Sequence, residues 1–61
     1  MAKAKVQYSY ASLHNMLRST TDRKTICTII IIALSQWGER KLNDYEICGL
    51  FETAVSEIKS I

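Results

Sequence analysis

The sequence contains few side chains that could catalyse a reaction or bind a metal ion. Its only histidine is His14, and its only cysteines are Cys27 and Cys48. A structural zinc site takes four ligands at a characteristic spacing, whereas these residues supply three with no such spacing. The sequence also has no glycine-rich phosphate loop and no nucleophile motif. We therefore expect a protein that is not an enzyme, with no metal site and no cofactor.

Whether the two cysteines are reduced or form disulfides depends on the cellular compartment. The N-terminal stretch MAKAKVQYSY lacks the apolar core of a secretory signal peptide, so we expect a cytoplasmic, reducing environment. There a free cysteine usually packs as a small buried hydrophobic residue, which is our expectation for Cys27 and Cys48. A disulfide or redox role is the alternative.

Long hydrogen-bond donors alternate with apolar or small residues at the start of the chain. Lys3, Lys5 and Gln7 fall on one side of an extended backbone, which predicts a half-exposed strand over residues 3–7. A lone strand leaves its backbone groups unpaired, so we expect it to pair with the same strand of a second chain. Two such strands form a ribbon that fits the major groove of DNA, where lysine contacts guanine or phosphate and glutamine contacts adenine.

Length and composition favour a mainly α fold. The 61 residues predict one small helical domain spanning 1–61, near the lower size limit for independent folding. The chain has no proline and two glycines, too few for the frequent turns of a sandwich or barrel. The net charge of +2 is uneven, because residues 1–41 carry +5 and residues 42–61 carry −3. The first part could therefore meet an anionic partner.

Hydrophobic spacing predicts three helices, at about 9–19, 24–38 and 44–59. The third begins with Asn43 as N-cap and Glu46 three residues later, which is the pattern of a capping box. Its apolar residues form one helical stripe: Ile47, Cys48, Phe51, Ala54, Val55 and Ile58. The second begins after a cap among Thr20, Thr21 and Asp22 and ends near Gly38.

The second predicted helix contains four consecutive isoleucines, so apolar side chains surround it. Its uncharged stretch, residues 25–38, has 14 residues, fewer than the about 20 that span a membrane, so we expect a buried helix and no membrane contact. One face should contact the rest of the chain: Ile29, Ile30, Ala33, Leu34 and Trp37. The isoleucines off that face would lose roughly 2 kcal/mol each in water, which predicts a homodimer or higher homo-oligomer. The expected interface comprises Ile26, Ile30, Ile31, Ile32 and Trp37.

Taken together, these segments resemble the ribbon-helix-helix repressor family. AKAKVQ matches its strand, YASLHNMLRS its first helix, TDRKT its loop and IIIIALSQW its second helix, so the resemblance covers roughly residues 2–38. It implies a small dimeric transcriptional regulator that binds duplex DNA. DNA contacts would come from Lys3, Lys5 and Gln7, and phosphate contacts from Arg23, Lys24 and Thr25 at the start of the second helix. The loop departs from the family because it lacks the usual glycine.

The alternative is a small helical protein that binds another protein and not DNA. An inhibitor or adaptor of phage or plasmid type, acting on a host protein, needs no sequence motif. In that case Lys3 and Lys5 are solvated, and Tyr8, Tyr10 and Trp37 are candidate anchors of an interface.

Overall fold

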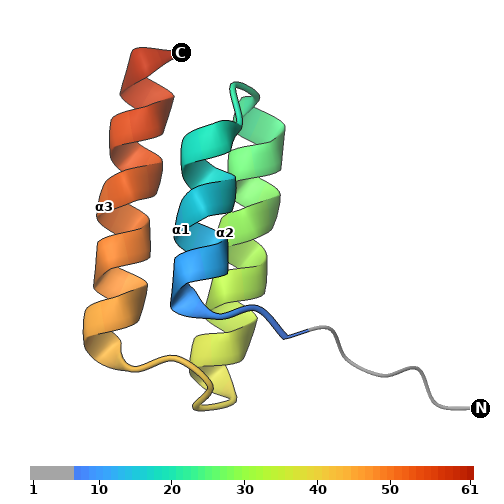
Figure 1. Cartoon of the computed structure of the whole chain (residues 1–61), viewed down its shortest axis with the longest axis vertical. Coiled ribbons are helices and arrows are strands. Elements are labelled where there is room, and N and C mark those ends of the chain that lie inside the picture. The colour runs from blue at the N-terminus through green and yellow to red at the C-terminus, as the bar shows by residue number, and fades with distance from the viewer. Residues whose placement is uncertain (1–6) are drawn as a thin grey trace, which may run out of the picture.

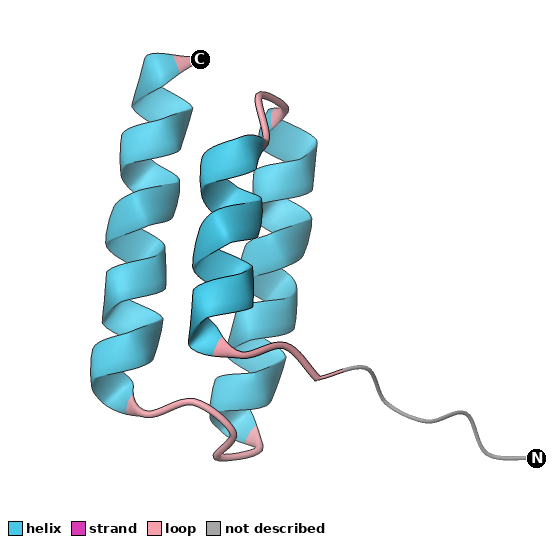
Figure 2. Ribbon diagram, viewed as in Figure 1, coloured by secondary structure: helices cyan, strands magenta, loops and turns pink. Residues whose placement is uncertain are grey.

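The computed structural model describes residues 7–61, which fold as three α-helices joined by short loops (Figure 2). The helices are α1 (Tyr10–Ser19), α2 (Arg23–Gly38) and α3 (Asp44–Ser60). The prediction of a mainly α chain with three helices is confirmed, and each boundary agrees to within one residue. Residues 3–6 of the predicted strand lie outside the described range, and Gln7 is not part of a strand.

The helices alternate in direction, so that α1 and α3 run one way and α2 runs the opposite way (Figure 1). The loop between α1 and α2 therefore lies at the same end of the bundle as the C-terminus of α3. The loop between α2 and α3 lies at the opposite end, next to the start of α1. All three pairs of helices are in contact.

Each helix begins where a polar side chain caps it. The side chains of Ser9, Asp22 and Asn43 each accept a hydrogen bond from the backbone N–H three residues later. At α3 the carboxylate of Glu46 also accepts from the backbone N–H of Asn43, at 2.9 Å, so the predicted capping box is confirmed. Such caps satisfy N–H groups that have no partner inside the helix.

The end of α2 is a Schellman turn. The backbone N–H of Lys41 donates to the carbonyl of Gln36 at 2.7 Å, and the N–H of Arg40 donates to the carbonyl of Trp37 at 2.9 Å. Arg40 lies in the left-handed region at φ 64°, the position that glycine usually takes in this motif. Gly38, which we expected to end the helix, is its last residue and has no positive φ.

The core lies where the three helices meet. On α2 the buried stripe is Ile26, Ile29, Ala33 and Gln36. The hydrophobic residues of the core are Leu13, Leu17, Ile26, Ile29, Ala33, Leu42, Ile47, Leu50 and Ala54. The predicted inner face of the helix was therefore wrong in part, since Leu34 and Trp37 are 39% and 42% exposed. A run of isoleucines carries no information on rotation about the helix axis, so α1 and α3 settle which side is buried.

Candidate interaction surface

A second apolar stripe on α2 and α3 faces away from α1. The side chains of Ile31, Phe51 and Val55 are 66%, 40% and 52% exposed. They border an open, almost wholly apolar groove of about 470 Å³ between α2 and α3, whose floor is Ile26 and Ala54. We define the α2–α3 face as the remaining side chains of this groove: Cys27, Ile30, Ile31, Phe51, Val55 and Ile58.

Helical spacing extends this face toward the other end of the bundle. Leu34 follows Ile31 by three residues, and Cys48 precedes Phe51 by three, so each lies on the same side of its helix as the face. Leu34 is 39% exposed and Cys48 is also exposed. Each large apolar side chain left half in water forgoes roughly 1 to 2 kcal/mol. A continuous apolar surface of this kind is characteristic of a protein–protein contact.

The charges are arranged unevenly around this face. Arg23 and Lys24, in the first turn, are the only charged residues of α2. Lys59 is in the last turn of α3, at the same end of the bundle, whereas Asp44 and Glu46 are in its first turn, at the other end. Along α3, the edge of the face thus runs from Lys59 to Asp44, and the exposed Arg40 and Lys41 of the α2–α3 loop lie at the end with Asp44.

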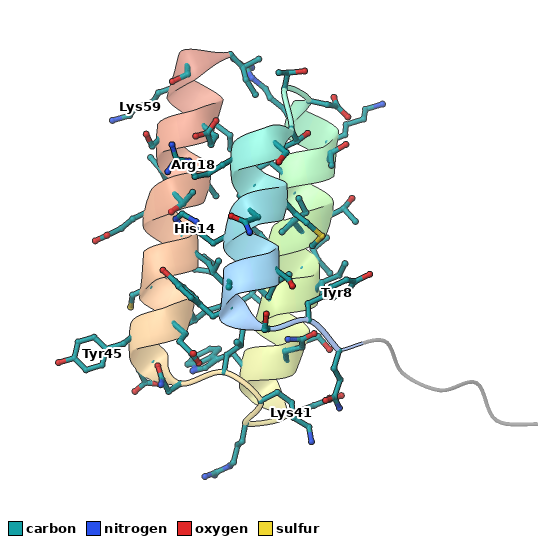
Figure 3. The ribbon with its side chains drawn as sticks, in the orientation of Figure 1. Tyr8, His14, Arg18, Lys41, Tyr45 and Lys59 are labelled. Atoms are coloured by element: carbon teal, nitrogen blue, oxygen red, sulfur yellow. The ribbon has the colours of Figure 1, made fainter. Side chains whose placement is uncertain are left out.

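The two remaining acids of α3 lie on its side toward α1. Glu52 and Glu57 line a polar groove with His14 and Arg18, which reach from α1 toward α3 in Figure 3. Glu52 also borders the outer side of α3 beside Phe51. Polar side chains thus cover the α1–α3 groove, in contrast to the α2–α3 groove.

The predicted dimer-interface residues are divided between several environments. Ile30 and Ile31 line the α2–α3 groove. Ile26 has no exposed surface, because it belongs to the core of its own chain. Ile32 is half-buried on the other side of α2, in a groove with Tyr8 and residues of α1. The indole N–H of Trp37 donates to the carboxylate of Asp44 at 2.9 Å and so fastens the end of α2 to the start of α3.

The contribution of α3 to the exposed surface was not predicted from the sequence. The predicted apolar stripe of α3 included Phe51 and Val55, which are exposed, and did not include Leu50, which is buried with Ile47 and Ala54. The width of the apolar stripe on α3 could have indicated this surface. The stripe contains two adjacent rows of apolar residues, whereas packing against one neighbouring surface needs a single row.

The expectation that Cys27 and Cys48 are buried was wrong. Both are free and exposed, and Cys27 lines the α2–α3 groove. Their sulfur atoms therefore belong to the surface of the bundle, where an apolar partner could cover them.

A buried amide holds the chain segment before α1 against α2. The backbone N–H of Tyr8 donates to Oε1 of Gln36 at 2.8 Å, and Nε2 of Gln36 donates to the carbonyl of Tyr8 at 2.7 Å. Gln36 is 5% exposed and is the only buried polar residue of the described range. Lys41 is close by, since its N–H bonds to the carbonyl of Gln36 and it lies below Tyr8 in Figure 3.

The predicted DNA contacts lie mostly at the surface. Lys3 and Lys5 fall outside the described residues, and Gln7 is exposed. Arg23, Lys24 and Thr25 are exposed at the start of α2. However, the carboxylate of Asp22 already accepts both the backbone N–H of Thr25, at 3.2 Å, and its hydroxyl, at 2.8 Å. A phosphate at this helix start would have to share that N–H with a carboxylate.

Within residues 7–61, no three ligating side chains gather closely enough to hold a metal ion. None of the helices there has the length and apolar character to cross a membrane. Comparison with known protein families, with curated proteins and with solved structures gives no match.

Proposed function

We propose that this chain is a small helical interaction protein that binds a helical protein surface through its α2–α3 face. The exposed apolar groove between the two helices carries the proposal. Its spacing suits helices, since exposed apolar residues recur on α2 and on α3 at intervals of three and four. Phe51 at the rim of the groove is the aromatic side chain that such an interface would bury.

The charges at the ends of the face define the partner further. At one end, Lys24 and Lys59 border the face, and at the other, Asp44 lies on the same row of α3 as Cys48 and Phe51. A complementary surface has an apolar stripe with acids at one end and bases at the other. A uniformly basic or uniformly acidic helix would meet like charge at one end of the face.

Photo-crosslinking in cells that make the protein tests this function. A benzophenone amino acid at position 31 stands on the exposed face, and the same amino acid at Ala11, an exposed residue of α1, is the matched control. We expect discrete crosslinked products from position 31 only, each identified by mass spectrometry. Val55→Asp in the same chain should abolish them, because it places a charge in the groove. Products that are equally abundant from both positions, or absent from position 31, would count against the function.

Duplex DNA is the second candidate partner, in line with the ribbon-helix-helix resemblance. The contact between Lys41 and Gln36 favours it, because Gln36 also holds Tyr8. Tyr8 therefore lies near the exposed Arg40 and Lys41, and Lys3 and Lys5 precede it in the sequence by five and three residues. Arg40 and Lys41 could bind phosphates, and Lys3 and Lys5 would add to them if the chain before Gln7 follows the same DNA backbone.

Fluorescence anisotropy with a labelled duplex at about 50 mM and about 200 mM salt tests DNA binding, because phosphate contacts make affinity depend steeply on salt. The double variant Lys3→Ala/Lys5→Ala should weaken binding and flatten that dependence. Absence of binding at the lower salt concentration would exclude this candidate.

A further inference from the structure

The α2–α3 face has charges of opposite sign at the two ends of α3, Asp44 and Lys59. A second copy of this face therefore has the charges that a complementary partner needs. Because α2 and α3 are antiparallel, the basic first turn of α2 adjoins the last turn of α3 with Lys59. At the other end, the bond between Trp37 and Asp44 places the acidic first turn of α3 against the end of α2. A copy turned end for end brings Lys59 at the end of one α3 toward Asp44 at the start of the other, and it does so at both ends of the face.

We infer that the partner on the α2–α3 face is a second copy of this chain, related by a twofold axis that crosses both helices near Ile31 and Phe51. This inference rests on the proposed function and names its partner. Each helix then lies antiparallel to its own counterpart, and the four helices form an antiparallel bundle. The two α1 helices remain on the outside.

The spacing of exposed residues fixes where the axis crosses. On α2, Ile31 lies midway between Lys24 and Gly38 along the exposed row. On α3, Phe51 lies midway between Asp44 and Ile58. Since Ile31 and Phe51 line the same groove, both can lie on one axis. Each would then meet its own counterpart at the centre of the interface.

Charge decides between this axis and the main alternative, an axis parallel to the helices. The parallel axis would bring Lys24 next to Lys59 of the partner subunit, because both residues lie at the same end of the face. The crossing axis instead brings Lys59 toward Asp44 of the partner subunit.

The face is large enough for a modest dimer. Helices of 16 and 17 residues lying side by side cover about 24 by 20 Å, so roughly 480 Å² in projection, and their protruding side chains present more accessible area. Specific interfaces usually bury about 800 Å² per partner, so this face is at the small end of their range. Interfaces of that size are typical of weak association, and we expect a dimer that forms at micromolar concentration.

Sedimentation equilibrium of the purified chain tests the second copy. At about 100 µM, far above a micromolar Kd, we expect twice the chain mass of 7.0 kDa. Ile31→Asp and Val55→Asp should each give monomers with an unchanged helical circular dichroism spectrum, because both residues are exposed in the single chain. Tyr45→Asp is the matched control: Tyr45 is 89% exposed, outside the groove, and should leave the dimer intact.

The failures of the two proposals are distinguishable. A wild-type chain that is monomeric at this concentration, while position 31 still crosslinks to a different protein, contradicts the second copy and leaves the proposed function standing. Absence of both self-association and crosslinking contradicts both. An oligomer that persists in Ile31→Asp and Val55→Asp uses another surface and also contradicts the inference.

Disulfide crosslinking tests the axis. In a Cys27→Ser/Cys48→Ser background, Ile31→Cys places a thiol on the crossing axis, within reach of its counterpart. A mild oxidant should remove two electrons and two protons from the thiol pair and give a covalent dimer. Ala11→Cys, exposed on α1 and away from the groove, is the control and should stay monomeric on denaturing gels. Crosslinking of Ala11→Cys but not of Ile31→Cys would contradict this axis.

Discussion

Gln36 and Tyr8 are joined by two hydrogen bonds, in which the side-chain amide of one pairs with the backbone of the other. The amide accepts from the N–H of Tyr8 at 2.8 Å and donates to its carbonyl at 2.7 Å. In this geometry the side chain substitutes for a neighbouring strand, which normally satisfies both groups of an extended residue. The position of Gln36 on the buried side of α2 therefore decides where the chain enters the bundle.

Replacing this amide should destabilise the fold. Gln36→Met keeps the approximate length of the side chain but leaves the N–H and carbonyl of Tyr8, which is half-buried, without their partner. We expect a loss of about 1 to 3 kcal/mol in the free energy of unfolding, measured by urea denaturation. Ser35→Ala, an exposed neighbour on α2, should change it by less than about 0.5 kcal/mol. Equal effects from both variants would mean that the paired bonds contribute nothing.

Gly49 is the site of a second prediction, because the Tyr10 ring of α1 lies over it. A Cβ built on Gly49 would lie 2.9 Å from the hydroxyl oxygen of Tyr10, whereas the nearest ring carbons are 3.5 and 3.6 Å away. Alanine normally stabilises a helix interior by about 1 kcal/mol relative to glycine. In the wild type, the new Cβ of Gly49→Ala should push the Tyr10 hydroxyl out of its position, and the cost of this shift should cancel most of the stabilisation.

The variant Tyr10→Phe provides the matched background, because it removes the hydroxyl and leaves the ring. There Gly49→Ala should stabilise the protein by up to about 1 kcal/mol. Thermal unfolding of the four proteins in this double-mutant cycle gives the coupling energy between the two positions. A coupling energy of zero would show that Tyr10 does not restrict position 49.

Arg40 supplies a third prediction, since it has a left-handed backbone at φ 64° in the turn that ends α2. A residue with a Cβ is strained there by roughly 1 kcal/mol, and glycine is not. Arg40→Gly should therefore raise the free energy of unfolding by up to about 1 kcal/mol, less some loss from the more flexible unfolded chain. Arg40→Ala is the control, because it removes the charge and retains the strain. A gain of the same size from both variants would assign the effect to charge.

The helix boundaries could be predicted from the sequence because local chemistry sets them. Asn43 with Glu46 caps α3 using groups within one turn, and Asp22 does the same for α2. Neither cap depends on how the helices pack. The prediction of three helices succeeded for this reason.

The rotation of each helix about its axis could not be predicted, because packing sets it. Every side of α2 is apolar near Ile29 to Ile32, so several faces could have served as the core. The burial of Gln36 was also unforeseeable, since its partner is the backbone of Tyr8, 28 residues earlier. The exposed face of α2 could be identified only from the packing of α1 and α3 against its opposite, buried side.

The last prediction separates core from surface within the isoleucine-rich helix. Ile26 is fully buried, whereas Ile31 is 66% exposed in the single chain. Ile26→Ala should cost about 2 to 5 kcal/mol at any protein concentration, because it leaves a cavity in the core. Ile31→Ala should cost little in dilute protein, and its cost should grow with concentration if a second copy covers this side chain. Urea denaturation at two protein concentrations measures both effects. A cost of Ile31→Ala that is large and independent of concentration would mean that Ile31 packs within its own chain.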